Sequence, residues 1–259
     1  MTFRQLLAEQ IIALVSEAQL SAIEWGGDVH VPHGDIEVAR EVGCKTREAG
    51  LEVAAYGSYY QVGESEAAGL SFASVLETAL ALGGPVIRVW AGKKSPGDAD
   101  EHYREMVAAD TQRIAAMAED AGVPGVPGVG IAYEFHANTL TETAASAMDL
   151  LKAANHENVT TLWQVPLSVW SEQRLESLKT VLPQLSNVHV YHMTAVDGGI
   201  ERRPLVEGEV DWIRDLGVIN NDERLRYALL EFVQDDDPDC FLRDAAVLRE
   251  WIERVCEQV

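Results

Sequence analysis

The chain has 259 residues, of which 47% are hydrophobic and 24% are charged, and its formal net charge is −22. A chain of this length can bury a large core, as one α/β domain or as two small ones. No apolar run approaches the ~20 residues of a membrane helix, which argues against a membrane protein. The negative charge argues against general nucleic-acid binding, which depends on Lys and Arg.

Short runs rich in β-branched and aromatic residues predict seven strands. In chain order they are SAIEW (21–25), LEVAAYG (51–57), PVIRVW (85–90), VGIAYEF (129–135), VTTLWQV (159–165), NVHVYH (187–192) and YALLEF (227–232). Longer amphipathic patterns between them predict helices over about 6–19 and over 35–50, 71–84, 99–122, 139–155, 171–182 and 237–255. Glycines at 50, 83 and 122 are plausible helix ends.

Strands that alternate with helices predict a parallel sheet. An eighth strand is needed to close a barrel, and MTFRQL (1–6) is the candidate. The total length matches the ~250 residues of a TIM barrel. A doubly wound sheet is the competing architecture, but the GxGxxG phosphate loop typical of that fold is missing from the sequence. We therefore predict a (β/α)8 TIM barrel that spans residues 1–259 as one domain.

Polar side chains gather at the carboxyl ends of the predicted strands, where TIM barrels carry their active sites. They are Glu24, Tyr56, Arg88, Trp90, Glu134, His136, Gln164, His189, His192 and Glu231. Residues two apart share a face of a strand. His189 and His192 are three apart, so we expect His189 to point inward and His192 to lie on the rim.

Glu134, Gln164, His189 and Glu231 come from four successive strands at corresponding depth. Two carboxylates, one amide oxygen and one imidazole are a plausible set for one divalent cation. The oxygens suit Mn²⁺ or Mg²⁺, and the histidine admits Co²⁺, Zn²⁺ or Fe²⁺. Each residue has an ordinary alternative role, such as a salt bridge for a glutamate or a rim hydrogen bond for a histidine.

These blocks resemble the xylose isomerase-like TIM barrels, which include sugar-phosphate isomerases, ketose 3-epimerases and inosose dehydratases. The resemblance depends on SAIEWGGDVHVPHGD, GLEVAAYGSYYQVG, VIRVWAG, AYEFH, NVHVYH and YALLEFV, and it covers nearly the whole chain. It implies that Glu134, Gln164, His189 and Glu231 hold one divalent metal, and that Glu134 and Glu231 transfer protons. The epimerases usually carry Asp, then His three residues later, where this chain has Gln164 and Leu167.

The expected activity is that of a metal-dependent sugar or sugar-phosphate isomerase or epimerase, acting by proton transfer next to a carbonyl through an enediolate. The candidate substrate-binding residues are Glu24, Tyr56, Arg88, Trp90, His136 and His192. For Arg88, a phosphate or hydroxyl contact and a salt bridge to a strand-end acid are equally open. Two alternatives remain: a dehydratase for keto-polyols of the inosose type, and a non-catalytic sugar-binding barrel with a degenerate metal site.

Cys44, Cys240 and Cys256 are scattered and form no CxxC motif. A disulfide framework is therefore not expected, and a reducing cytoplasm is the predicted compartment. The expected partner is a small sugar or sugar phosphate, with neither nucleic acid nor membrane. We expect the C-terminal helix to pack on the barrel, and a homo-oligomer remains open.

Overall fold

The structure is a computed structural model that describes residues 2–122, 128–165, 172–222 and 224–257. The helices are α1 (Ala8–Glu17), α2 (Ile36–Glu48), α3 (Phe72–Leu82), α4 (Glu101–Asp120), α5 (Ala144–Ala154), α6 (Glu172–Val181), α7 (Glu209–Asn220) and α8 (Pro238–Cys256). The strands are β1 (Ala22–Gly26), β2 (Glu52–Gln61), β3 (Val86–Trp90), β4 (Gly130–Glu134), β5 (Val159–Gln164), β6 (Leu185–Val190), β7 (His192–Val196), β8 (Gly199–Arg203) and β9 (Ala228–Leu230).

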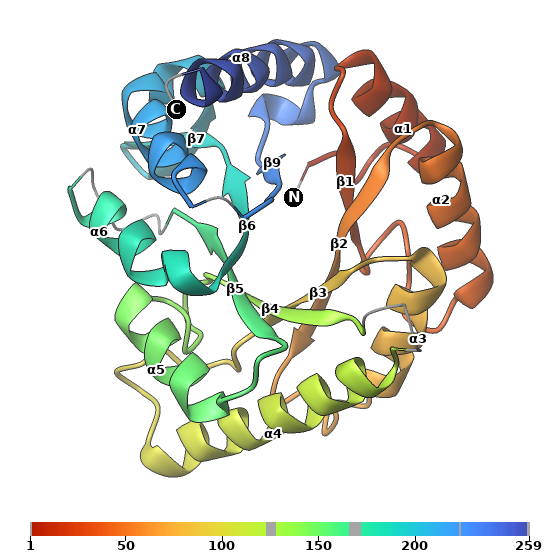
Figure 1. Cartoon of the computed structure of the whole chain (residues 1–259), viewed down its shortest axis with the longest axis vertical. Helices are drawn as coiled ribbons and strands as arrows, with labels where there is room; N and C mark the ends of the chain where they lie inside the picture. Colours follow the sequence, from red (N-terminus) through yellow and green to blue (C-terminus); the bar gives the residue numbers. More distant parts are fainter. Residues whose placement is uncertain (1, 123–127, 166–171, 223, 258–259) are drawn as a thin grey trace.

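Seven of these strands form one sheet, in the order β1-β2-β3-β4-β5-β6-β9, and every neighbouring pair is parallel. The helices form a ring outside the strands (Figure 1). The architecture is an α/β TIM barrel that is nearly closed, as the alternation of strands and helices predicts. All seven strands expected from the apolar runs are present, and the expected helices are present as well.

Local sequence explains where several helices begin and end. The side chains of Asp35, Ser71 and Asp100 each accept a hydrogen bond from a backbone N–H in the first turn of the following helix. These residues therefore satisfy donors that a helix start would otherwise leave unpaired. Gly83 ends α3 with a positive φ of 81°, a conformation that glycine adopts without a Cβ penalty.

The predicted strand at the N-terminus is wrong, because residues 2–6 lie in turns and loop. Phe3 has a φ of 61°, which breaks an extended chain, and its buried ring packs edge-on against Phe241 of α8 at 5.3 Å between centroids. Among the described residues, β1 and β9 are therefore not paired with each other. They stand on either side of the N-terminus (Figure 1).

The segment after β6 holds three elements that the sequence patterns did not predict: β7, β8 and α7. β7 and β8 form an antiparallel hairpin, with Gly198 at a φ of 98° in its turn. α7 then follows, and Trp212 and Leu216 are among its buried residues. Because β6 ends at Val190, His192 belongs to the hairpin and not to a barrel strand.

The outward faces of the barrel strands supply much of the core. Trp25, Tyr133 and Trp163 are at most 1% exposed and contact the helices. The indole N–H of Trp25 donates to Thr46 of α2, and that of Trp163 donates to Ser177 of α6. Large aromatic side chains with a paired polar group contribute strongly to a core. The residues that alternate with these aromatic side chains at the strand ends face the inside of the barrel, and they are charged or polar.

Candidate metal centre and active site

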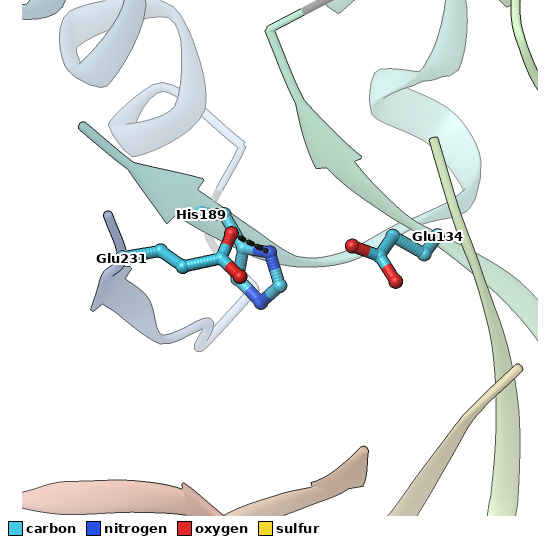
Figure 2. Close-up of side chains that lie close together, drawn as sticks. All are labelled: Glu134, His189 and Glu231. Carbon is cyan, nitrogen blue, oxygen red and sulfur yellow. Dashed lines mark ion pairs between the residues drawn. The ribbon is translucent and has the colours of Figure 1, made fainter. Parts of the chain in front are cut away.

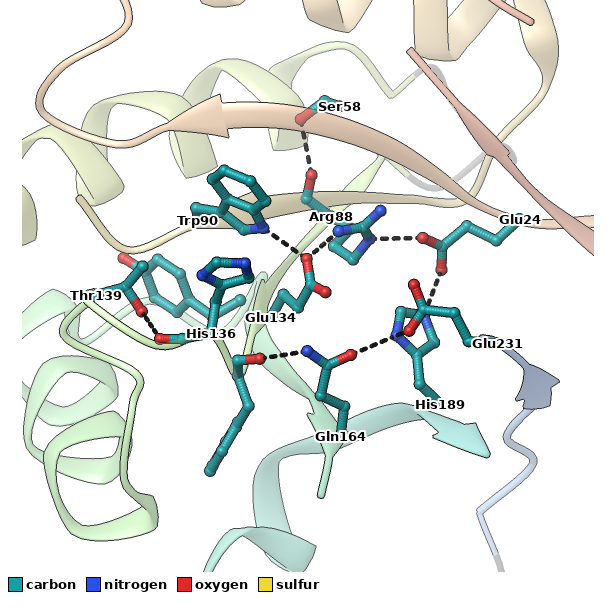
Figure 3. A network of polar contacts seen from close by, with 12 residues as sticks. Glu24, Ser58, Arg88, Trp90, Glu134, His136, Thr139, Gln164, His189 and Glu231 are labelled. Carbon is teal, nitrogen blue, oxygen red and sulfur yellow. Dashed lines mark hydrogen bonds and ion pairs between the residues drawn. The ribbon is translucent and has the colours of Figure 1, made fainter. Parts of the chain in front are cut away.

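Among the described residues, five charged side chains converge inside the barrel at the carboxyl ends of its strands (Figure 3). They are Glu24 on β1, Arg88 on β3, Glu134 on β4, His189 on β6 and Glu231 directly after β9. Arg88, Glu134 and His189 are at most 4% exposed. Buried charges are tolerated only where they are paired, so the contacts among these groups decide what the cluster can do.

Arg88 is the central cation of this cluster. Its Nε donates to Glu24 Oε1 at 2.5 Å, and its Nη1 donates to Glu134 Oε2. The indole N–H of Trp90 donates to the same Glu134 oxygen at 2.6 Å. Gly57 on β2 makes room for the guanidinium, because a Cβ there would lie 2.5 Å from Arg88 Nη2. Burial lowers the pKa of Arg88, but Glu134 and Glu24 raise it well above its usual value.

His189 contacts acidic or amide oxygens through both ring nitrogens. Nε2 lies 3.3 Å from Glu24 Oε2, and Nδ1 lies 3.0 Å from Glu231 Oε2 and 3.1 Å from Gln164 Oε1. The orientation of Gln164 is fixed, because its Nε2 donates to the carbonyl of Phe135 at 2.8 Å. Burial lowers the pKa of His189, but Glu231 and Glu24 raise it to about 10.

The contacts form a chain of alternating charge that runs Glu134, Arg88, Glu24, His189, Glu231. Burial raises the pKa of Glu24, but Arg88 and His189 lower it to about 2. Burial likewise raises the pKa of Glu231, and His189 lowers it below its usual range. The carboxylates of Glu24 and Glu231 therefore stay ionised inside the barrel, each beside a cation.

The donor set fits a divalent cation. Glu134, His189 and Glu231 each offer one ligand atom, and these atoms lie within 4.8 Å of one another (Figure 2). Ligands ~2.1 Å from one ion and at right angles to each other are ~3 Å apart. The separations from His189 Nδ1 to Glu231 Oε2 and to Gln164 Oε1 match that spacing. An oxygen-rich set with one imidazole suits Mg²⁺, Mn²⁺, Co²⁺ or Zn²⁺.

Two of the remaining candidates lie together at one side of the cluster. The ring of His136 stacks on Trp90, with 4.4 Å between centroids and a tilt of 32°. His136 Nδ1 lies 2.8 Å from the carbonyl oxygen of Ala137. Because Trp90 also donates a hydrogen bond to Glu134, it connects the partly exposed imidazole of His136 to the charged cluster.

Tyr56 and His192 lie elsewhere. Tyr56 is fully buried, and its hydroxyl contacts the Val31 carbonyl at 2.8 Å and His33 Nδ1 at 2.7 Å. His192 begins the hairpin, and burial lowers its pKa by more than Glu207 raises it, so that the net change is downward. Neither residue contacts the cluster in the described part of the chain. Leu167 lies outside the described residues.

Tyr59 was not among the candidates predicted from the sequence, but its ring contacts two members of the site, Arg88 and Trp90. The Arg88 guanidinium lies 5.1 Å from the Tyr59 ring centroid, and Trp90 packs edge-on against the same ring at 5.4 Å. Tyr59 has a φ of 54°, and the pairing of β2 with β3 shifts register between Gly57 and Tyr60. Strand parity read from the sequence cannot anticipate such a shift, so it could not place Tyr59.

A cavity of about 310 Å³ reaches the cluster from the gap between β1 and β9. Glu24, His189 and Glu231 are among its polar lining residues, and Phe3, Val15 and Leu248 are among its apolar ones. This volume is at the small end of the range for ligand pockets.

None of the described helices is both long and apolar enough to cross a membrane.

The fold and the site together define a parallel α/β barrel with an acid–imidazole centre at the carboxyl ends of its strands. The family described as "Xylose isomerase-like TIM barrel" matches residues 12–250. The chain belongs to this family, as the sequence blocks indicate. A comparison with curated proteins found no match.

Several solved structures are similar to this chain. The probable 3-DHS dehydratase AsbF from Bacillus anthracis, involved in petrobactin synthesis, has a TM-score of 0.77 at 20% identity, covering 95% of this chain and 96% of that one. A xylose isomerase-like TIM barrel protein from Mycobacterium smegmatis, in complex with magnesium, has a TM-score of 0.74 at 13% identity, with 97% and 91% covered. D-allulose 3-epimerase from Methylomonas sp., in complex with D-allulose, has a TM-score of 0.69 at 17% identity, with 94% and 90% covered.

Proposed function

We propose that this protein is a metal-dependent isomerase or epimerase of a sugar or sugar phosphate. The observation that carries the proposal is the grouping of Glu134, His189 and Glu231, with one ligand atom from each inside a 4.8 Å cluster at the strand ends. The similarity in fold to D-allulose 3-epimerase and to L-ribulose 3-epimerase supports the substrate class. The similar magnesium complex supports a divalent ion.

Glu134, Gln164, His189 and Glu231 would hold the cation. When bound, it would supply Lewis-acid polarisation of a substrate carbonyl. One carboxylate, Glu134 or Glu231, would remove the proton from the carbon beside that carbonyl. The other would return a proton to the opposite face in an epimerase, or to the adjacent carbon in an isomerase. The glutamate that removes the proton must be ionised near neutral pH, and the lowered pKa of Glu231 fits that role. The other glutamate must carry the proton that it returns.

Arg88 and Trp90 restrict the motion of Glu134 in this scheme. Both donate to its Oε2, so Oε1 is the oxygen that neither of these two side chains contacts (Figure 3). A fixed carboxylate loses little orientational freedom when it accepts a proton from substrate. Arg88 therefore acts on the reaction through Glu134, and its pairing leaves the recognition of any substrate phosphate to other groups.

A dehydratase acting on a keto-polyol is the second candidate. The same proton removal would generate an enolate, and a proton donor beside the leaving hydroxyl would then release water. His136 is the residue that favours this reading, because it stacks on Trp90 at the edge of the cluster and is partly exposed. The similarity in fold to the probable 3-DHS dehydratase is in line with it.

Product analysis separates these activities. The purified protein, supplied with Mn²⁺, Mg²⁺, Co²⁺ or Zn²⁺, is incubated in ²H₂O with a panel of ketoses, ketose phosphates and inososes. An isomerase or epimerase yields an isomer that carries deuterium at the carbon next to the carbonyl. A dehydratase yields a product lighter by one water. If no substrate turns over and no divalent ion binds, a non-catalytic sugar-binding barrel replaces both proposals.

We further propose a cytoplasmic protein whose partner is a small molecule. All three cysteines are free thiols, which agrees with a reducing compartment. The net charge of −22 opposes nucleic-acid binding. α8 packs on its own chain through Phe241, Leu248 and Trp251, so it does not require a second subunit.

A further inference from the structure

We propose that Glu24 is a positioning residue that fixes the imidazole ring of His189, and thereby aims Nδ1 at the cation site. The inference builds on the metal centre of the proposed function. It assigns Glu24 to the support of a metal ligand, whereas the sequence suggested a contact with substrate.

The two oxygens of Glu24 have two different partners, and both partners are donors. Oε1 accepts from Arg88 Nε at 2.5 Å, and Oε2 lies 3.3 Å from His189 Nε2. The Glu24 side chain is 11% exposed and those of Arg88 and His189 are 4% exposed, so bulk water competes weakly for these contacts. A carboxylate has two acceptor oxygens, so Glu24 can accept from both partners with a separate oxygen for each.

The contact between Glu24 and Nε2 also determines where the other ring nitrogen of His189, Nδ1, points. With Nε2 facing Glu24, Nδ1 faces Glu231 Oε2 at 3.0 Å and Gln164 Oε1 at 3.1 Å. A flipped ring would aim Nδ1 away from both. Histidines that bind metals generally donate their other ring N–H to a carboxylate or carbonyl, which sets the ring orientation and the tautomer. Glu24 occupies that place in this site.

Arg88 in turn holds Glu24 in place. The guanidinium binds Glu24 through Nε and Glu134 through Nη1, so one side chain ties the support of His189 to another candidate ligand (Figure 3). Gly57 gives both groups their room, since a Cβ there would lie 3.0 Å from Glu24 Oε1. These contacts thus join four strands, β1, β3, β4 and β6.

Two substitutions of Glu24 separate positioning from simple space filling. Glu24→Gln keeps nearly the same shape but has one acceptor and one donor for two donor partners. Glu24→Asp keeps both acceptor oxygens on a shorter stem. If the two acceptor oxygens at position 24 hold His189 in place, the affinity for Mn²⁺ should fall in the order wild type, Glu24→Asp, Glu24→Gln. We expect the Gln variant to bind Mn²⁺ ~10- to 100-fold more weakly, as for other outer partners of metal ligands. Glu207→Gln, which alters a surface glutamate paired with Arg203, is the matched control.

The measurements are calorimetric titration with Mn²⁺ and ¹H–¹⁵N NMR of the histidine side chains, the latter with a chelator and with Mg²⁺. We expect a protected His189 Nε2–H in the wild type that exchanges faster in the Gln variant. If both variants and the control bind Mn²⁺ within twofold of the wild type, or if affinity falls in the order wild type, Gln, Asp, the inference is wrong. A wild type that binds no divalent ion refutes the proposed metal centre instead. The exchange of Nε2–H in the chelator arm then decides the role of Glu24 separately.

Discussion

The two faces of the barrel strands differ sharply at their carboxyl ends. On the outward face, Trp25, Tyr133 and Trp163 are buried against helices and each is satisfied by one hydroxyl. On the inward face, one residue before or after each of them, Glu24, Glu134 and Gln164 enter a shared network. The same backbone alternation therefore separates residues that stabilise the fold from residues that supply chemistry.

The largest expected effect falls on the inward face. Glu134→Gln removes a candidate proton-transfer group and metal ligand, and we expect turnover to fall by ~10²- to 10⁴-fold. Steady-state kinetics on the substrate identified by product analysis checks this value. Glu48→Gln, an exposed residue at the end of α2, is the control and should keep full activity. Turnover within threefold of the wild type would remove Glu134 from the mechanism.

Arg88→Met tests whether the inward face depends on its central cation. The change leaves Glu24 and Glu134 buried without their shared partner, and loss of one member of a buried pair costs ~3–5 kcal/mol. Chemical denaturation measures the free energy of unfolding. Arg40→Met, on the exposed face of α2, should change it little. Equal effects of the two substitutions would contradict the pairing of Arg88.

A substitution on the outward face should lower the stability of the protein without changing its affinity for Mn²⁺. Ile131 on β4 is fully buried, and Ile131→Ala should lower the free energy of unfolding by ~2–5 kcal/mol. We expect Mn²⁺ affinity per folded molecule to stay within twofold of the wild type, because Ile131 points away from the cluster. A large loss of affinity in a folded variant would show that the two faces are not separable.

Gly57→Ala should give a smaller effect. The added Cβ would meet Arg88 Nη2 at 2.5 Å and Glu24 Oε1 at 3.0 Å, so the guanidinium must shift. Overpacking of this kind costs ~1–3 kcal/mol. Gly217→Ala on α7, where a Cβ would meet nothing within 4 Å, is the control. Denaturation of both variants checks the difference.

A change of pH is the mildest perturbation of the inward face. The folded pKa of His189 is raised from 6.5 to about 10, so its contribution to stability is complete below pH ~6.5 and is lost as pH rises toward 10. Unfolding measured with a chelator between pH 6 and 10 should show this loss. His189→Gln should flatten the profile over that window. Identical slopes would mean that the imidazole is not held by Glu24 and Glu231.

The sequence predicted the strands and the grouping of the candidate ligands better than the closure of the barrel. Period-two alternation and strand-end position are local properties, so Glu134, Gln164, His189 and Glu231 could be grouped from the order of residues alone. The N-terminal segment failed because burial of Phe3 against Phe241, a contact between opposite ends of the chain, overrides its strand-like composition. Tyr59 was missed because a register shift in β2 changes which residues face inward.

The partners of the charged residues were also beyond local reasoning. Arg88 was equally compatible with a substrate contact and a salt bridge. Only the order β1-β2-β3 in the sheet, with Gly57 of β2 between them, brings Glu24 to the Nε of Arg88. The hairpin of β7 and β8 was hidden because its strands are short and mostly polar or exposed.

Anomalous diffraction from a crystal soaked in Mn²⁺ would locate a bound cation without reference to activity. We expect one strong peak inside the barrel, ~2.0–2.4 Å from oxygens of Glu134, Gln164 and Glu231 and from Nδ1 of His189. A peak elsewhere, or none at saturating Mn²⁺, would contradict the proposal that these four side chains hold a cation.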